Sequence, residues 1–243
     1  KSTLKKRIIQ NNKNKFYIFE TNCYQIERDF TLSPWMKIIS AIDHELKKDK
    51  SKIPVFWEDV TLKLFQSSEN KNLPSSNILE NRENFNVEFI NNVLVNAINE
   101  LGKYKKTIIV MEDICYADEQ SLNFIINLIL HFSENVIFLL TTSKEKREKI
   151  ENLIISLKAA EKMLLLDIER FSKQDVFIIV KKALGEDFVN AKEIADIYEK
   201  SGGNALFLNE YINLYKNNNK EQLLTRKLSD LLAEKFSFLN AEE

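Results

Sequence analysis

An uninterrupted apolar stretch that ends in two adjacent carboxylates is the feature that most limits how this chain can fold. Residues 107–111 read Thr-Ile-Ile-Val-Met, and Glu112 and Asp113 follow directly. A run of this kind is typical of a parallel strand buried on both faces, with helices packed on its sheet. Open α/β sheets bind their ligands at the carboxyl ends of the strands. The sequence therefore predicts an α/β fold with Glu112 and Asp113 at the ligand-binding edge.

Other apolar stretches predict further strands near residues 15–21, 135–142 and 162–167, with helical stretches between them. Such alternation of strand and helix favours a parallel sheet. Helical periodicity is clearest between Phe89 and Leu101, where Gly102 is expected to end the helix, and again over 119–132. Trp35 and Trp57 are expected to anchor the core.

The polarity of the chain changes twice along its length. Residues 66–84 are rich in Ser, Asn and Glu, which predicts a flexible insertion because such residues bury little apolar surface. After residue 170 the pattern becomes helical throughout, and Ser172 with Asp175 fits a helix start. Helices are expected near 172–184, 190–200, 204–217 and 221–238. We therefore expect an α/β core over 1–170 and a helical subdomain over 171–243.

The composition argues against several kinds of partner. The 243 residues carry 35 basic and 36 acidic side chains and a net charge of −1, so no overall charge attracts nucleic acid or an anionic membrane. No apolar run approaches the roughly 20 residues of a membrane span. The two cysteines, Cys23 and Cys115, are expected to be free thiols. These features predict a cytoplasmic protein in which this part binds neither nucleic acid nor membrane.

Two short motifs indicate a nucleotide site. The strand that ends in Glu112 and Asp113 resembles the Walker B motif, in which an acid holds Mg²⁺ and a carboxylate orients the attacking water. Lys1, Ser2 and Thr3 match the end of a P-loop, G-x-x-x-x-G-K-[ST]. A helical stretch and an apolar strand follow them, as in a P-loop fold. We therefore expect the first strand and the glycine loop to precede this sequence.

Four segments in this order resemble the STAND ATPases, whose AAA-like core occurs in large LuxR-type bacterial transcriptional regulators. The segments are Cys23-Tyr24-Gln25-Ile26-Glu27 with Leu32-Ser33-Pro34-Trp35, then Glu112-Asp113-Ile114-Cys115-Tyr116-Ala117-Asp118, then Phe138-Leu139-Leu140-Thr141-Thr142-Ser143-Lys144, and Ser201-Gly202-Gly203-Asn204-Ala205-Leu206-Phe207-Leu208. Cys115 and Tyr116 depart from the family's His-Trp, and Ala205 replaces its Pro. Asp118 is read as the N-cap of the next helix.

The resemblance implies a P-loop NTPase-like parallel sheet with a C-terminal helical lid, and ATP and Mg²⁺ as ligands. It also implies that the strand over 15–21 lies beside the strand over 106–112, which leaves Cys23 and Cys115 near one edge. The implied phosphate-binding residues are Lys1, Ser2 and Thr3, and Ser2 and Glu112 would hold Mg²⁺. Asp113 would be the catalytic carboxylate, and Lys144 would be the γ-phosphate sensor. Gly203 and Asn204 would form the turn that contacts the nucleotide.

The function implied is an ATP-binding and hydrolysing signal-transduction switch within a larger transcriptional regulator. ATP would bind between the sheet and the lid, and the adjacent glycines would let the lid move. Its partners would be DNA-binding and helical-repeat sensor modules of the same polypeptide, with possible self-association. Two alternatives stay open: a non-catalytic, degenerate P-loop scaffold for protein interaction or oligomerisation, and an AAA+ motor acting on DNA.

Overall fold

The computed structural model divides the chain into two compact units, Lys1–Leu165 and Leu166–Glu243. The structure describes residues 2–48, 53–69, 87–131, 136–185 and 190–216. The first unit is a mixed α/β body, and the second is helical in its described part. The sequence placed the division at residue 170, within the extended segment that joins the last helix of the first unit to the first helix of the second.

A three-stranded parallel sheet is the centre of the first unit. Its strands are β1 (Tyr17–Asn22), β2 (Thr107–Glu112) and β3 (Val136–Leu140), and β2 lies between the other two. Phe19 is level with Ile109, and Met111 is level with Leu140. The predicted parallel pairing of the first strand with the strand bearing Ile108 to Met111 is confirmed. Residues 107–111 are all buried, as their unbroken apolar character requires.

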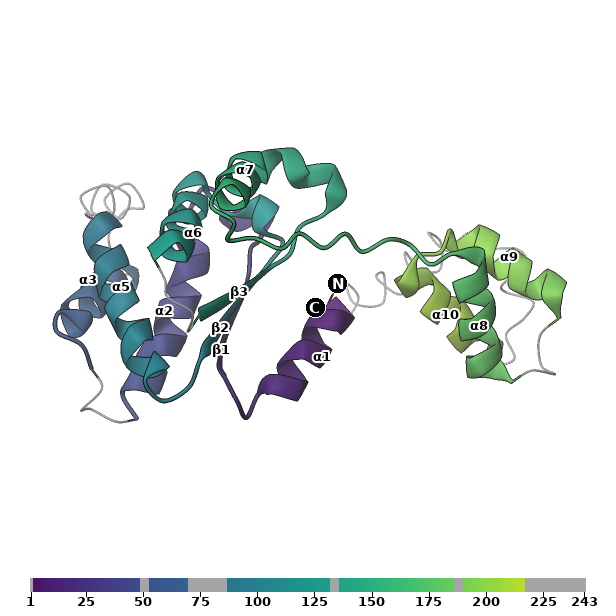
Figure 1. The fold of residues 1–243 in the computed structure, drawn as a ribbon, viewed down its shortest axis with the longest axis horizontal. Helices are drawn as coiled ribbons and strands as arrows, with labels where there is room; N and C mark the ends of the chain where they lie inside the picture. Colours follow the sequence, from purple (N-terminus) through teal and green to yellow (C-terminus); the bar gives the residue numbers. More distant parts are fainter. Residues whose placement is uncertain (1, 49–52, 70–86, 132–135, 186–189, 217–243) are drawn as a thin grey trace. The chain divides into compact units, whose positions relative to one another are not determined.

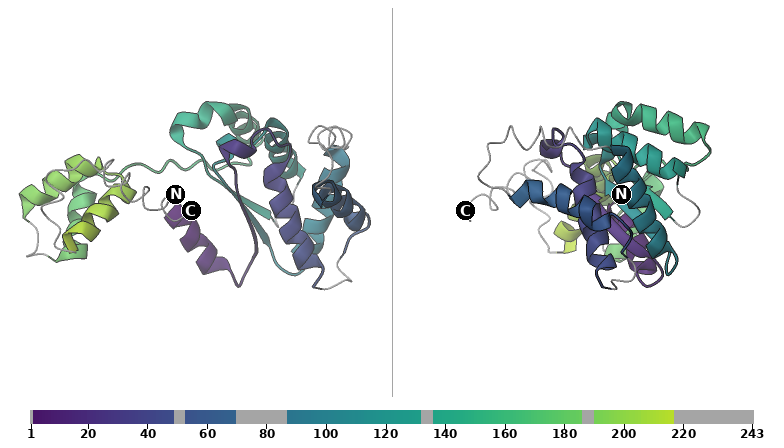
Figure 2. Two further views of the ribbon diagram at one scale, coloured as in Figure 1. Left: turned by 180° about the vertical axis from the view of Figure 1, so that it is seen from behind. Right: turned by 90° about the vertical axis from the view of Figure 1, so that its left-hand side faces the viewer.

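Helices cover both faces of this sheet, as buried parallel strands require. On one face lie α2 (Ser33–Leu46), α3 (Trp57–Glu69), α5 (Val87–Gly102) and α6 (Glu119–His131), and α1 (Ser2–Asn12) lies on the other (Figure 1). Figure 2 shows the same separation from behind. Helix α7 (Glu151–Ala159) packs against α6. Short 3-10 turns follow the strands: η1 (Gln25–Glu27), η3 (Ile114–Tyr116) and η4 (Lys144–Ile150).

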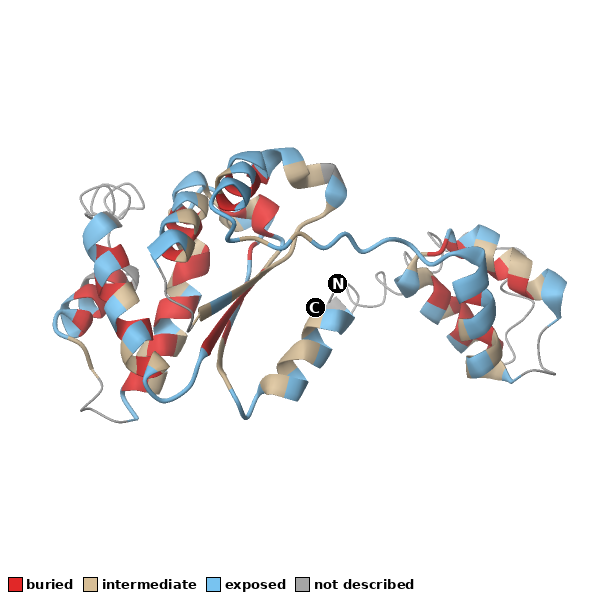
Figure 3. Cartoon of the chain, viewed as in Figure 1, coloured by how far each residue is buried: buried red, intermediate tan, exposed pale blue. Residues whose placement is uncertain are grey.

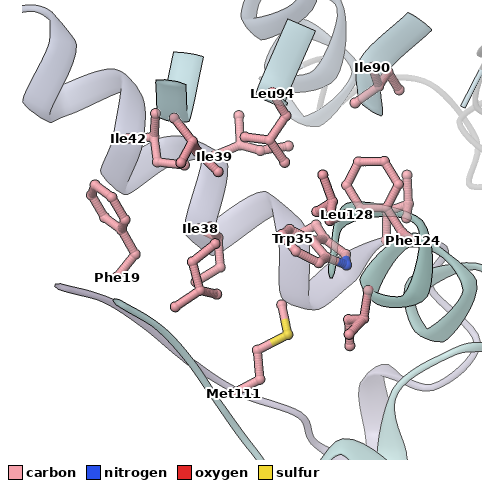
Figure 4. Close-up of a cluster of buried hydrophobic side chains, with 14 of the residues drawn as sticks. Phe19, Trp35, Ile38, Ile39, Ile42, Ile90, Leu94, Met111, Phe124 and Leu128 are labelled. Carbon is pink, nitrogen blue, oxygen red and sulfur yellow. The ribbon is translucent and has the colours of Figure 1, made fainter. Parts of the chain in front are cut away.

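The main core lies between the sheet and α2, α5 and α6. Phe19 and Met111 point from the strands toward the helices; Ile38 of α2 lies between them, and Ile42 and Leu94 lie farther from the strands (Figure 4). Trp35 is fully buried and meets the Phe124 ring edge to face, with 4.8 Å between ring centroids. Its indole N–H donates to the carbonyl of Ser121 over 3.3 Å, so this buried N–H has a hydrogen-bond partner.

The predicted anchoring role of both tryptophans is confirmed. Trp57 at the start of α3 is also buried, and its indole nitrogen donates to Asp43 over 3.0 Å. The predicted polar insertion at 66–84 overlaps the last turn of α3, which extends to Glu69. The rest of that insertion, 70–84, lies outside the described residues.

The predicted fourth strand at 162–167 is wrong for the described part of the chain. Residues 162–172 form neither helix nor strand, and Leu164 and Leu166 expose 82% and 69% of their surface. An apolar run forms a strand only where a neighbouring strand supplies hydrogen bonds. Among the described residues, β3 pairs with β2 alone, and no strand lies beside residues 162–167. Figure 3 shows this segment as a largely exposed run.

Helices α8 (Lys173–Leu184), α9 (Ala191–Ser201) and α10 (Ala205–Lys216) form the described part of the second unit. They match three of the predicted helices, and the fourth, at 221–238, lies outside the described residues. The expected start at Ser172 is a capping box with Asp175, and Asn190 with Glu193 forms another before α9. This unit has its own core, made by Val176, Val180, Ile194, Ile197, Leu208, Tyr211, Ile212 and Tyr215.

Candidate functional site

The carboxyl ends of the three strands are joined by backbone hydrogen bonds that fix the position of the two acids. The Cys23 N–H donates to the Glu112 carbonyl over 2.9 Å, which ties the end of β1 to the end of β2. On the other side, the Thr141 N–H donates to Met111 over 3.0 Å and the Ile114 N–H donates to Thr141 over 2.9 Å. Glu112 is therefore the last residue of the central strand, at the edge where the sequence predicted it.

Asp113 turns the chain sharply away from the sheet. Its backbone is left-handed, with φ 52° and ψ 47°, a conformation that Asp tolerates better than most residues. The Asp113 N–H donates to the hydroxyl of Thr141 over 3.1 Å, and its carbonyl accepts from Tyr116 over 2.9 Å. These bonds hold the turn while the residue stays exposed. The carboxylate is thus free to meet solvent beside a fixed backbone.

The Glu112 carboxylate is paired with a lysine of α1, the helix on the face of the sheet opposite α2. The ammonium of Lys5, the fourth residue of α1, donates to Glu112 and also to Glu20 of β1, the latter over 3.1 Å. Burial alone would lower the pKa of Lys5, but the hydrogen bonds and charges of the two glutamates raise it above its usual value. The contact brings the first turns of α1 to the carboxyl end of β2.

Buried sulfur and acidic side chains lie next to the two acids. Cys23 and Cys115 are free and buried. Burial raises the pKa of the Cys23 thiol to about 12, and the charges of Asp118 and Asp113 add to the effect. Asp118 accepts from the Ser121 N–H over 2.8 Å and so caps α6, which confirms its predicted role. The thiols are packing groups in a negative environment, with no disulfide between them.

The other residues predicted for phosphate binding differ in how far the structure describes them. Lys1 lies outside the described residues, and Ser2 is the first residue of α1 with a side chain that is not described. Thr3 is exposed in the first turn of that helix. Lys144 is exposed at the start of η4, after the strand that supplies Thr141. Among the described residues, Ser2 and Thr3 therefore lie on α1, and Lys144 lies after β3.

Gly203 and Asn204 belong to the second unit and form the turn between α9 and α10. Gly203 has φ 68°, and its N–H donates to the hydroxyl of Ser201 over 3.3 Å. Asn204 caps α10, because its side chain accepts from the Leu206 N–H over 2.9 Å. Within its own unit, this segment is therefore the boundary between two helices, with Asn204 as the cap of α10.

The donor set at Glu112 can accept a cation. Glu112 and Glu20 come from neighbouring strands and converge on one ammonium group. Mg²⁺ is usually held by one or two carboxylates together with waters and substrate phosphates, so a site of this kind needs few protein ligands. Among the described residues, no group of three or more His, Cys, Asp or Glu side chains is arranged to hold a metal.

Lys5 and Thr141 were not predicted as site residues. Thr141 lay within a quoted motif, and its contact with the backbone of Asp113 depends on two loops that only the fold brings together. Lys5 lies outside the motifs that the sequence offered for nucleotide binding. Neither residue has a feature that sequence alone would mark.

In the described part of the chain, no helix is long and apolar enough to cross a membrane. Comparisons with protein-family models, with curated proteins and with solved structures gave no match.

Proposed function

We propose that this chain is a Mg²⁺-dependent, ATP-binding and hydrolysing switch domain of the P-loop type, similar to the STAND ATPases. One observation carries the proposal: Lys5 of α1 contacts Glu112 at the end of the central strand. This contact brings the start of a helix and the adjacent acids Glu112 and Asp113 to one edge of a parallel sheet.

The groups at this edge suit different parts of a bound nucleoside triphosphate. The first N–H groups of a helix lack partners within the helix and attract phosphate, which favours Lys1, Ser2 and Thr3 as phosphate-binding residues. Glu112 would hold Mg²⁺ together with Ser2, and the metal would neutralise charge on the phosphates. The exposed Asp113 would orient or deprotonate the attacking water, on a backbone fixed by Thr141. Lys144 follows Thr141 by three residues and would sense the γ-phosphate.

The proposed output is a change in the equilibrium between two arrangements of a larger signalling protein. A ligand shifts such an equilibrium only if it binds the two arrangements with different affinity. DNA-binding and sensor modules of the same polypeptide are the proposed partners.

The test is Asp113→Asn in the full-length protein. ATP binding should be retained, and single-turnover hydrolysis should fall by roughly 10²-fold or more, the usual scale for loss of a positioned base. Glu112→Gln should instead weaken ATP binding only when Mg²⁺ is present. Asp29→Asn, which alters an exposed acid elsewhere in the first unit, is the matched control.

Two results would count against the proposal. Hydrolysis that is unaffected by Asp113→Asn would remove this residue from the reaction. Wild-type protein that binds no ATP with or without Mg²⁺ would instead favour the non-catalytic scaffold. In that case the Lys5–Glu112 ion pair would serve only to hold α1 against the sheet.

A further inference from the structure

We propose that Lys5 is a positioning residue that competes with a divalent cation for Glu112, and that Glu20 relieves this competition by holding Lys5 when the cation binds. The inference rests on the proposed function, because it concerns the same carboxylate. It adds a regulatory pair, Lys5 and Glu20, to a site that otherwise consists of acids and phosphate-binding groups.

The geometry provides one ammonium and two acceptors. Side chains alternate along a strand, and Glu20 is level with Val110 while Asn22 is level with Glu112. Glu20 and Glu112 therefore point to the same face of the sheet, the face on which α1 lies (Figure 1). Lys5 contacts both carboxylates at once. Its ammonium can stay bonded to Glu20 without a change in the backbone if Glu112 turns away.

The two acceptors differ in exposure, and this difference gives them different roles. The side chains of Lys5 and Glu112 are only 12% and 15% exposed, whereas Glu20 is 42% exposed. A buried ion pair that loses one partner leaves an uncompensated charge, which is strongly unfavourable. Glu112 could not turn to a cation at low cost if Lys5 were left alone. Glu20 removes that obstacle, because it already lies 3.1 Å from the ammonium.

A purely structural role for this ion pair predicts a different response to mutation. If Lys5 only fastened α1 to the sheet, its removal would loosen the edge and weaken cation binding. If Lys5 and Glu20 acted only through their charges, their effects on cation affinity would be independent and would multiply. Competition predicts that Glu20 matters only while Lys5 is present.

The experiment measures the affinity of the full-length protein for Mn²⁺ alone, without nucleotide, by electron paramagnetic resonance. Lys5→Met should tighten Mn²⁺ binding about fivefold and Glu20→Gln should weaken it about fivefold, since groups in direct contact typically couple on this scale. In the Lys5→Met background, Glu20→Gln should change the affinity by less than about twofold. Lys5→Arg should restore the dependence on Glu20.

Lys6→Met is the matched control, because it removes the same charge from an exposed position on the same helix. It should change Mn²⁺ affinity less than about twofold. Tryptophan fluorescence during urea unfolding reports whether each variant keeps the fold of the first unit, which contains Trp35 and Trp57.

The possible failures can be told apart. Multiplicative effects in the double variant, or weaker Mn²⁺ binding in folded Lys5→Met, would overturn the role of Lys5 and leave the Glu112 assignment intact. Mn²⁺ affinity that is unchanged by Glu112→Gln would place the metal elsewhere and overturn the proposed metal ligand itself. An absence of Mn²⁺ binding in both wild type and Lys5→Met would overturn both.

Discussion

The residues at the sheet edge show how backbone order and side-chain freedom can coexist within a few positions. Cys23 and Thr141 hold the chain on either side of Glu112 and Asp113 by main-chain hydrogen bonds. The side chain of Asp113 stays exposed while its backbone is held in a left-handed conformation that costs of order 1–3 kcal/mol. Leu32, Phe56 and Glu161 also have positive φ, so strain alone does not mark the site. Asp113 differs from these three residues because it lies directly beside Glu112.

The buried thiol of Cys23 should be inert in the folded protein. Burial and the nearby charges of Asp118 and Asp113 raise its pKa from 9.0 to about 12, so its thiolate fraction at pH 8 should fall about a thousandfold. Iodoacetamide labelling at pH 8, followed by peptide mass spectrometry, should modify Cys23 only after unfolding in urea. Equal labelling rates in the folded and unfolded protein would contradict this prediction.

The same pKa shift predicts a loss of stability in alkaline solution. The raised pKa means that the folded state keeps the thiol proton when the unfolded state has lost it. The contribution to stability is therefore complete below pH 9 and is lost as the pH rises from 9 toward 12. Cys23→Ala should reduce this pH dependence in urea unfolding measured between pH 8 and 11.

For single residues, the sequence could predict only what local signals indicate. The position of Glu112 and Asp113 followed from the apolar strand before them, and the Asp118 cap followed from the helical stretch after it. Lys5 meets Glu112 across 107 residues of sequence, and nothing in either segment encodes that distance. Contacts of this kind follow from the packing of α1 against the sheet.

At the scale of elements, the sequence succeeded where periodicity and a cap agreed. Helix α5 ends at Gly102 as expected, and α8 begins with the Ser172 and Asp175 capping box. The stretch at 162–167 had the apolar character of a strand without any local signal for its partner. Its exposed Leu164 and Leu166 show that strand formation depends on a neighbour as well as on the residues themselves.

The turn between α9 and α10 should not tolerate a side chain at Gly203. Its φ is 68°, and a Cβ there would lie 2.1 Å from the carbonyl oxygen of Phe171. The Phe171 N–H also donates to Gly203 over 2.8 Å, so the two backbones cannot separate without losing a hydrogen bond. Gly203→Ala should therefore destabilise the second unit by more than about 1 kcal/mol in urea unfolding followed by circular dichroism.

Gly202→Ala is the matched control for this prediction. Gly202 also has a left-handed backbone, with φ 54°, but a Cβ there would approach only the guanidinium end of the Arg170 side chain, at 3.2 Å, which can move. Its cost should be that of the backbone conformation alone, and so smaller than the cost at Gly203. Equal losses at the two glycines would show that close approach to Phe171 has no energetic weight.

For the molecule as a whole, the two separate cores suggest that each unit contributes its own stability. One core lies between the sheet and α2, α5 and α6, and the other lies among α8, α9 and α10. The segment at 162–172 that joins the units has no regular structure. Both tryptophans of the chain are in the first unit, so their fluorescence follows the unfolding of that unit alone.

We expect Ile197→Ala to destabilise the second unit and to leave the first unchanged. Ile197 and Ile39 are each 2% exposed, one in each core, and truncation of a buried Ile to Ala typically costs about 2–5 kcal/mol. In urea, Ile197→Ala should shift part of the circular dichroism transition while the tryptophan midpoint stays at its wild-type value. Ile39→Ala should lower the tryptophan midpoint. If Ile197→Ala lowered that midpoint as much as Ile39→Ala does, the two units would unfold as one cooperative body, because the loss of one core would then be felt fully in the other.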